Sequence, residues 1–213
     1  MWAGGVQTRL PFVFFMKTVV ITGGIGCGKS WVATALGSLN ASFRYSADEA
    51  IHAAYDDPAI RSKIAKALNL PDTDHDLSGK ELRRAIRPRV MTDRSAKSTL
   101  EEILHPMARH SFLETRRLAN DAGAKLLVAE IPLYYETGAA FDGDVVVVVA
   151  ASRSTQLRRL QFYRSLDVQT AEEMLSMQMP MDEKVQRADV VIWNDGSLDA
   201  LEAELSVLHH AIS

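Results

Sequence analysis

The segment Gly23-Gly24-Ile25-Gly26-Cys27-Gly28-Lys29-Ser30 matches the pattern G-x-x-x-x-G-K-[ST], in which a glycine-rich turn surrounds phosphate groups. Residues 18–21 predict a buried strand before the turn, and residues 31–39 carry apolar side chains at helical spacing after it. Glycines let the backbone aim several N–H groups at one anion, and the start of a helix adds partial positive charge. Because strand, turn and helix occur in the order that the motif requires, a chance match in a glycine-rich turn is the weaker interpretation.

Several positions of this loop have an expected task. The Lys29 ammonium is expected to reach the β- and γ-phosphates of a nucleotide, and the Ser30 hydroxyl is expected to bind Mg²⁺. The other residues expected to contact the nucleotide here are Gly24, Ile25, Gly26, Cys27, Gly28 and Trp31.

Cys27 is the only cysteine in the chain, so no internal disulfide can form and a reducing cytosol is the expected compartment. A thiol in a phosphate loop also suggests a redox sensor. We favour a small residue that is tolerated where the backbone does the binding, because only Lys29 nearby would lower the pKa of the thiol.

The composition indicates one hydrophobic core with room for a smaller inserted lobe. The chain has 213 residues, 47% hydrophobic content and a formal net charge of -3. This near-neutral charge gives no electrostatic reason to expect binding to nucleic acid or to a membrane surface. No run reaches the roughly 18 apolar residues of a membrane-spanning helix. We expect a cytoplasmic protein, and a monomer or a weak homo-oligomer.

Residues 1–15 are expected to form an N-terminal extension of little function. They carry an apolar run after Arg9 that is faintly similar to a secretion signal, but no small-residue cleavage site follows it. Cleavage there would destroy the nucleotide site, and Met16 looks like a natural start.

Strands alternate with helices along the rest of the chain. Sequence patterns predict strands at 17–22, 43–46, 125–132, 144–150 and 189–194, and helices at 29–39, 49–55 and 198–212. The valine run 145–149 is typical of a central strand that is buried on both faces. This alternation predicts an α/β fold in which a five-stranded parallel sheet lies between two layers of helices.

Parallel strands bring their carboxyl ends to one edge of the sheet, where ligands bind. Asp48 follows the second strand, and its carboxylate is expected to accept a proton from an attacking hydroxyl or to help hold Mg²⁺. The alternative is that Asp48 caps the next helix, and position alone does not separate the two. The third strand is predicted to end at Pro132, and Leu133 and Glu136 are expected to follow it at the same edge.

Residues 51–120 are expected to form a helical lobe between the second and third strands, with its longest helix over 93–118. Breaks in its helices are predicted at Pro58, 70–76, Pro88 and His105-Pro106. A new helix is predicted to begin at residues 78–81. The lobe also holds a cluster of arginines, which are Arg83, Arg84, Arg87 and Arg89. Such cations suit an anionic substrate, although a solvated helix face is the simpler explanation.

A second basic region lies between the fourth and fifth strands. Residues 152–160 are predicted to begin an arginine-rich helix, with Arg164 beyond them, and residues 170–177 are predicted to form a return helix. Next to a phosphate loop, this hairpin suits a mobile lid over 152–188 that supplies positive charge and excludes water during phosphoryl transfer. Arg159 and Arg164 are the candidate residues, and a charged helix face is the alternative.

Together these segments resemble the dephospho-coenzyme A kinase family. The matching motifs occur in the family's order and cover about residues 17–208. They are residues 21–30, 47–48, 100–106, 131–133 with Glu136, 156–160, 178–184, and 188–192 with Asn194. The His105-Pro106 element and the Gln-Leu-x-Arg run that begins at Gln156 are far more specific than the glycine loop, which many kinases share.

The resemblance implies a P-loop fold of the nucleoside-monophosphate-kinase type, with a nucleotide-binding core made of 16–50, 121–151 and 189–213. It also implies transfer of phosphate from ATP to the ribose 3′-hydroxyl of dephospho-coenzyme A, the last step of coenzyme A biosynthesis, with Mg²⁺ present. In this family Asp48 matches the acidic residue near that hydroxyl, and Arg159 matches the lid arginine. Asn194 is expected at the nucleotide. Residues expected at the acceptor are Asp48, His105, Pro106, Pro132, Leu133 and Glu136.

The chain departs from the family pattern at several positions. Ser46 stands where the family usually has an acidic residue, and the bulky Trp31 replaces a common threonine. Arg164 lies one residue further from Gln156 than the family spacing suggests, and residues 79–95 align poorly. These departures leave two alternatives open, a nucleotide-binding regulatory protein with weakened catalysis and a kinase for another small acceptor.

Overall fold

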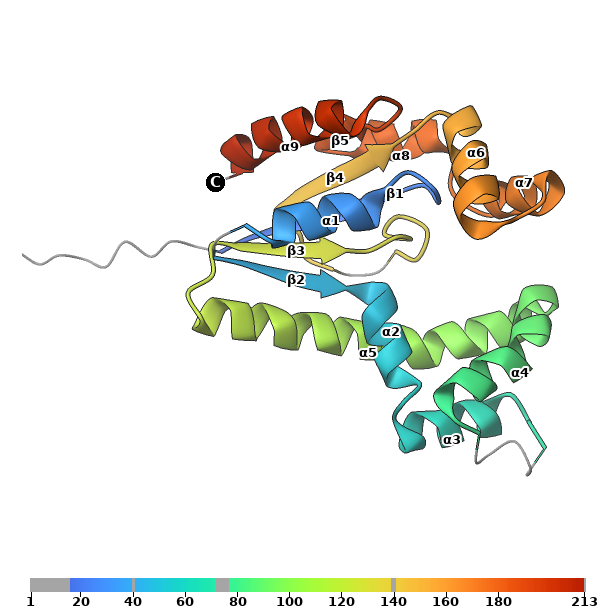
Figure 1. Ribbon diagram of the computed structural model, residues 1–213. Coiled ribbons are helices and arrows are strands. Elements are labelled where there is room, and N and C mark those ends of the chain that lie inside the picture. Colours follow the sequence, from blue (N-terminus) through green and yellow to red (C-terminus); the bar gives the residue numbers. More distant parts are fainter. Residues whose placement is uncertain (1–15, 40, 72–76, 139–140, 213) are drawn as a thin grey trace, which may run out of the picture.

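The structure, a computed structural model, describes residues 16–39, 41–71, 77–138 and 141–212. Its centre is a sheet of five parallel strands in the order β2-β3-β1-β4-β5 (Figure 1). The strands are β1 (Lys17–Gly23), β2 (Ser42–Ser46), β3 (Leu126–Glu130), β4 (Val145–Ala150) and β5 (Val190–Trp193). The predicted parallel sheet is therefore confirmed, and the predicted extension 1–15 lies outside the described residues.

Successive residues of the strands build a separate core on each side of the sheet. Val19 and Ile21 of β1 pack in a cluster with α1 (Lys29–Gly37) and α9 (Leu198–Ile212). Val20, between them, packs on the opposite side with α2 (Ala47–Ala54) and α5 (Arg94–Asp121). One strand can serve both cores because its side chains alternate between the two faces. The result is the expected three-layer α/β/α arrangement.

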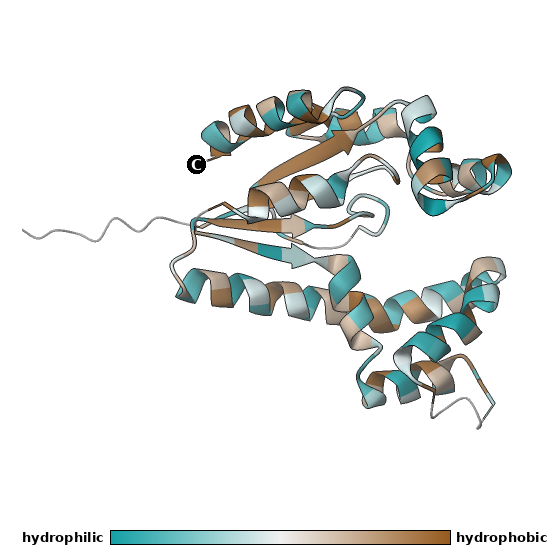
Figure 2. Ribbon diagram, viewed as in Figure 1, coloured by the Kyte–Doolittle hydropathy of each residue, from teal (hydrophilic) through white to brown (hydrophobic). Residues whose placement is uncertain are grey.

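The valine run of the fourth strand is buried, as its composition predicts. Val147, Val148 and Val149 of β4 are fully buried, and β4 is the strand drawn most uniformly in brown in Figure 2. The strand lies between β1 and β5, so neither of its edges is free. Burial on both faces and both edges explains why only apolar side chains occur in its central part.

A third hydrophobic cluster lies away from the sheet, in a unit that we call the helical lobe. It consists of α3 (Pro58–Ala67), α4 (Gly79–Thr92) and the first half of α5, packed against the end of α2. Ser78 and Glu81 form a capping box at the start of α4, in which each side chain accepts from the backbone N–H of the other. This arrangement satisfies two amides that a helix start leaves without partners. The predicted opening of a helix at this point is confirmed.

Two of the predicted helix breaks are wrong. Pro88 lies within α4 and Pro106 within α5, and both helices continue through these positions. Pro58 instead occupies the start of α3, where its missing N–H has no consequence. Residues on either side of Pro106, among them Leu104 and Ala108, are buried in packed clusters. Tertiary packing therefore outweighs the single hydrogen bond that the proline removes.

The region between β4 and β5 is helical throughout. α6 (Arg153–Arg164) and α7 (Val168–Ser176) form a hairpin, and α8 (Met181–Arg187) leads back to the sheet (Figure 1). The hairpin is confirmed, whereas α8 was not predicted as a helix. Ser165, in the left-handed region at φ 51°, ends α6 and turns the chain. No described helix is both long enough and apolar enough to cross a membrane.

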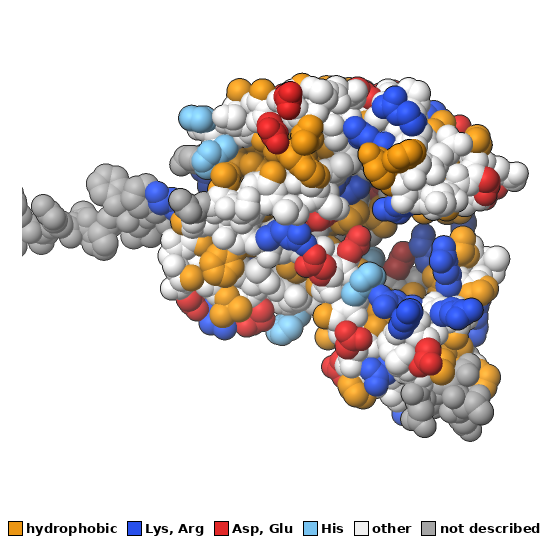
Figure 3. Space-filling view, in the orientation of Figure 1, with side chains coloured by type: hydrophobic (Ala, Val, Ile, Leu, Met, Phe, Trp, Pro, Cys, Tyr) orange, Lys and Arg blue, Asp and Glu red, His pale blue; other side chains and the backbone are white. Residues whose placement is uncertain are grey.

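The hairpin and the helical lobe both extend beyond the carboxyl ends of the strands (Figure 1). Figure 3 shows a hollow between them, bordered by Lys and Arg side chains on both sides. The fold thus brings two inserted helical units to the edge of the sheet at which the glycine-rich loop lies.

Candidate functional site

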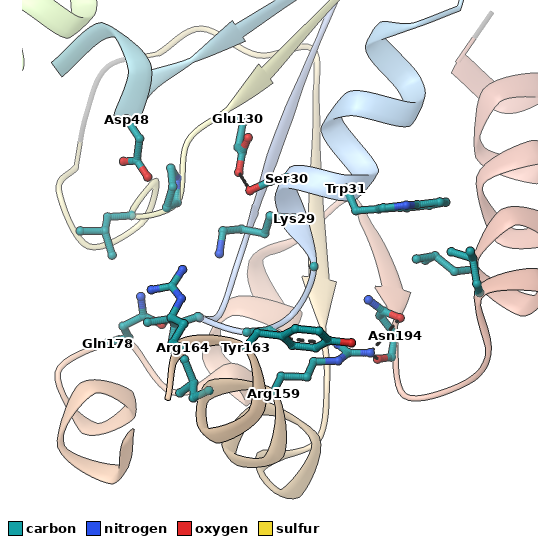
Figure 4. A pocket seen from close by; sticks show the side chains of 18 of the residues that line it. Lys29, Ser30, Trp31, Asp48, Glu130, Arg159, Tyr163, Arg164, Gln178 and Asn194 are labelled. Carbon is teal, nitrogen blue, oxygen red and sulfur yellow. Dashed lines mark hydrogen bonds between the residues drawn. The ribbon is translucent and has the colours of Figure 1, made fainter. Parts of the chain in front are cut away.

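The glycine-rich loop follows β1, the central strand, at the point where the sheet order changes direction. β1 pairs with β3 on one side and with β4 on the other, so the loop lies at the switch point where open α/β sheets bind ligands. A cavity of about 720 Å³ opens there (Figure 4). It is lined by eleven of the predicted site residues, which are Ile25, Gly26, Gly28, Lys29, Ser30, Trp31, Asp48, Pro132, Leu133, Arg159 and Asn194.

Gly28 has a conformation and a neighbour that a side chain would not tolerate. Its φ is +92°, in the left-handed region, and it caps the start of α1. A Cβ at this position would lie 2.5 Å from Nδ2 of Asn194. That nitrogen donates to the Cys27 carbonyl at 2.8 Å. Glycine therefore permits both the turn and the bond by which the fifth strand holds the loop.

Lys29 lies at the centre of the cavity. Its side chain is only 9% exposed, and Nζ donates to the Gly24 carbonyl at 2.8 Å. Burial lowers the pKa of this ammonium, while the nearby carboxylates of Glu130 and Asp48 act in the opposite direction. An anionic ligand in the cavity would add to the second effect. The backbone N–H groups of the first turn of α1, to which Lys29 belongs, have no acceptor within the helix and also suit an anion.

Ser30 is paired with a carboxylate that sequence reasoning missed. Its Oγ donates to Oε1 of Glu130 at 2.6 Å, and the Glu130 side chain is buried at the end of β3 (Figure 4). The two oxygens form a pair of hard donors that fits a divalent cation such as Mg²⁺. An available signal was the position of Glu130, because it closes a strand at the ligand edge of the sheet. In the sequence it was counted only as part of that strand.

Asp48 is not the helix cap that the sequence left possible. The cap of α2 is Ser46, whose side chain accepts from the Glu49 backbone N–H. Asp48 is exposed in the first turn of α2 and lines the cavity on the side opposite the hairpin (Figure 4). Ser46, one of the departures from the family pattern, thus has a structural task of its own. The carboxylate of Asp48 is left available to a ligand.

Side chains from both ends of the hairpin region hold the loop. Gln156 Nε2 donates to the Ile25 carbonyl at 2.7 Å, and the Ile25 N–H donates to Gln178 Oε1 at 2.8 Å. A Cβ on Gly24 would lie 2.4 Å from Gln156 Nε2, so this clamp also requires glycine there. The N–H and the carbonyl of Ile25 are therefore held at the same time from α6 and from the turn after α7.

These contacts correct part of the predicted anion site. The backbone N–H of Ile25 is taken by Gln178, and that of Cys27 donates to the Gly24 carbonyl at 3.3 Å. Neither N–H is available to a phosphate in this structure. The Cys27 side chain is fully buried, and Gly24 and Cys27 are absent from the cavity lining. Burial raises the pKa of the Cys27 thiol, which agrees with the structural rather than the redox interpretation.

Arg159 and Arg164 of α6 both reach the cavity. Arg159 donates to the Gly26 carbonyl at 3.1 Å and to the Asn194 carbonyl at 2.9 Å. Its guanidinium is therefore held between the loop and the end of β5. Arg158 is exposed and lies outside the lining, so the two adjacent arginines are clearly distinguished.

Three predicted acceptor residues lie outside this cavity. His105 and Pro106 are on α5 and do not line it, and Glu136 is occupied elsewhere. Oε1 of Glu136 lies 2.5 Å from Nζ of Lys184, which is fully buried in α8, and accepts from the Met179 N–H at 3.1 Å. Nζ of Lys184 also lies 3.4 Å from the Gly23 carbonyl. These contacts of Oε1 give Glu136 a structural role in joining α8 to the core, and its expected contact with an acceptor stays a prediction.

Comparisons with known proteins agree with this arrangement. The family model for dephospho-CoA kinase matches residues 17–200. A dephospho-CoA kinase of Chlorobaculum tepidum is 32% identical over 97% of this chain and 98% of its own length. That of Syntrophotalea carbinolica is 35% identical over 91% of this chain and 90% of its own.

Solved structures show the same similarity. Dephospho-CoA kinase from Campylobacter jejuni has a TM-score of 0.67 and 27% identity, with 93% of this chain and 98% of that chain covered. A protein from Thermus thermophilus has a TM-score of 0.76 and 28% identity over the same shares of the two chains. A shikimate kinase from Acinetobacter baumannii, at 14% identity and a TM-score of 0.51, shares the fold alone.

Proposed function

Since this chain belongs to the dephospho-CoA kinase family, we propose that it transfers the γ-phosphoryl group of ATP to the ribose 3′-hydroxyl of dephospho-coenzyme A, giving ADP and coenzyme A. The observation that carries the proposal is that Asp48 and Lys29 line one cavity, the first after β2 and the second after β1. A base for the acceptor and a cation for the donor thus lie on two sides of the space where phosphate would transfer.

The phosphates of ATP would lie against Lys29 and the first turn of α1. Lys29 is already desolvated, so the attraction between its ammonium and a phosphate placed beside it is only weakly screened by water. Ser30 and Glu130 would hold Mg²⁺, which supplies charge neutralisation on the β- and γ-phosphates when bound.

Asp48 would orient the 3′-hydroxyl and take its proton as the oxygen attacks the γ-phosphorus. The bond between the γ-phosphorus and the bridging oxygen breaks, and ADP leaves with the electron pair. Arg159 would stabilise the charge that develops on the transferring group, once it exchanges its present carbonyl partners for phosphate oxygens.

We further propose that the helical lobe binds the acceptor and that the hairpin acts as a lid. The hollow between these two units and the basic side chains around it support both roles (Figure 3). The arginines of α4 are candidates for the diphosphate of the acceptor. The protein is proposed to act in the cytoplasm, as a monomer or a weak homo-oligomer.

The proposal is tested by measuring ADP release with and without dephospho-coenzyme A. We expect acceptor-stimulated ADP release in the native protein, and a loss of about 100-fold or more in Asp48→Asn, because general bases contribute on that scale. Glu49→Gln is the matched control, since Glu49 is the next residue, is exposed and pairs with Arg44. It should retain near-normal turnover.

Three results would count against the proposal. Near-normal turnover in Asp48→Asn would remove Asp48 from the mechanism. ATP binding without any acceptor-stimulated ADP release would support the regulatory alternative. ADP release that is stimulated by a nucleoside monophosphate but not by dephospho-coenzyme A would support a different acceptor.

A further inference from the structure

The cavity has two chemically different halves. Lys29, Ser30, Asp48 and Glu130 make one half charged and polar. The other half contains the rings of Trp31 and Tyr163 together with Arg159 and Asn194 (Figure 4). The aliphatic side chains of Leu160, Leu198 and Leu201 also line the cavity. A nucleoside triphosphate has the same division, because charged phosphates are joined through a sugar to a flat base with an apolar face.

Trp31 is the aromatic wall nearest to the phosphate half. It is the third residue of α1, two positions after Lys29, and its side chain remains 38% exposed. Figure 4 shows the indole on one side of the cavity, with Tyr163, Arg159 and Asn194 on the opposite side. The ring does not pack in the hydrophobic core. It borders the part of the cavity in which the base of a nucleotide would lie if its phosphates were bound at Lys29.

We propose that the indole of Trp31 is the surface on which the purine base of the bound nucleotide stacks, and that it supplies affinity without selecting the base. This rests on the proposed function only in taking the ligand to be a nucleoside triphosphate. Stacking on an aromatic ring depends on the π-face that every base offers, so it does not distinguish adenine from guanine.

The side chains on the opposite side of the cavity would form the second surface of the base-binding site, and this surface is less rigid than the indole. Tyr163 is 76% exposed on α6, so its ring is free to approach a base from the other side. Arg159 is held by the Gly26 and Asn194 carbonyls at the back of the same wall. The fixed surface is thus the indole, which is anchored on the first turn of α1, and the adjustable surface is the exposed ring of Tyr163.

The position of Trp31 also explains a departure from the family pattern. Where the family commonly has threonine, this chain places a ring that extends away from the loop toward the apolar half of the cavity (Figure 4). A bulky residue is accommodated because it points into open space rather than into the phosphate site. The proposed gain is contact area with the base.

The test measures equilibrium binding of ATP, GTP and inorganic tripolyphosphate without any acceptor. We expect Trp31→Thr to weaken ATP and GTP by the same factor, about tenfold, since stacking is worth on the order of 1–3 kcal/mol per base. Tripolyphosphate, which has no base, should bind as in the native protein. Trp31→Phe keeps a ring and should recover most of the affinity.

A second readout is tryptophan fluorescence. With Trp2, which lies outside the described residues, replaced by Phe in every variant, ATP should quench the fluorescence of the parent protein and of Trp193→Phe. It should leave the fluorescence of Trp31→Phe unchanged, because Trp193 lies outside the cavity at 50% exposure. Equal weakening of tripolyphosphate and ATP in Trp31→Thr would overturn the proposal, as would unchanged ATP binding. If ATP binds in the expected pattern but dephospho-coenzyme A is not phosphorylated, the proposed function fails and the stacking role stands.

Discussion

The hairpin and the helical lobe border the same hollow, yet they are attached to the site in different ways. Gln156, Arg159 and Gln178, from the hairpin and the turn after it, all bind the backbone of the glycine-rich loop. The helical lobe has a hydrophobic cluster of its own, built around residues such as Leu82. Within the described residues, no hydrogen bond joins α3 or α4 to the loop.

This difference suggests a division of labour. A unit tied to the phosphate loop cannot move without disturbing the donor site, whereas a unit with an independent core can change its acceptor contacts without doing so. We therefore expect changes in the hairpin to alter ATP binding and chemistry, and changes in the helical lobe to alter stability or the acceptor. The following predictions test that separation.

The largest effect is expected at Arg159. Arg159→Ala should lower kcat about 1000-fold, the scale found when an arginine no longer stabilises the phosphoryl transition state, and should weaken ATP binding much less. Steady-state kinetics together with equilibrium ATP binding separate the two quantities. Arg158→Ala is the control, because that neighbouring side chain is exposed and outside the cavity. Equal losses in the two variants would show that only the overall charge of α6 matters.

The next effect concerns the base of the hairpin. Lys184→Met should lower the free energy of unfolding by about 3–5 kcal/mol, because it leaves the largely buried carboxylate of Glu136, which is 17% exposed, without its cation. Denaturant unfolding monitored by circular dichroism measures this change. In the double variant with Glu136→Gln, much of the stability should return. If the single and double variants are equally unstable, the ion pair is not the cause.

A smaller effect is expected from the clamp on Ile25. Gln178→Ala removes the acceptor of the part-buried Ile25 N–H and should raise KM for ATP roughly tenfold, since a desolvated N–H left without an acceptor costs on the order of 1–3 kcal/mol. KM for the acceptor should change little. Gln169→Ala, on the exposed side of α7, is the matched control. A larger change in acceptor KM than in ATP KM would break the proposed division between the two units.

The smallest effect tests the helical lobe. Ser78→Ala removes the cap of α4 and should lower the free energy of unfolding by about 1 kcal/mol while ATP affinity stays the same. Thermal unfolding and ATP titration on one preparation give both values. A drop in ATP affinity here would mean that the lobe is coupled to the loop after all.

The sequence predicted those parts of the fold that have local causes. The β-branched runs gave the strands, because burial between two helical layers leaves few other residues acceptable. Ser78 with Glu81 marked the start of α4 through local hydrogen bonds. The helix breaks predicted at Pro88 and Pro106 were wrong, because packing of the flanking residues decides whether a helix continues through a proline.

For the candidate site too, the residues with local sequence signals were predicted and those that depend on distant contacts were missed. Lys29 and Ser30 follow from a contiguous motif, and Asp48 from its place after a strand. Glu130 and the clamp by Gln156 and Gln178 depend on pairings across more than 90 residues, which no local pattern reveals. Glu136 was assigned to the acceptor from the family resemblance, and its pairing with Lys184, which is far away in sequence, could not be inferred from a local pattern.

The burial of the Cys27 side chain has a practical consequence. The chain has a single thiol, this thiol is fully buried, and burial raises its pKa. Alkylating reagents should modify it only during excursions that open the nucleotide end of the sheet. The rate at which Cys27 is labelled would therefore report how often such openings occur. A cysteine introduced on the surface could be labelled with a probe without labelling of Cys27 at the same time.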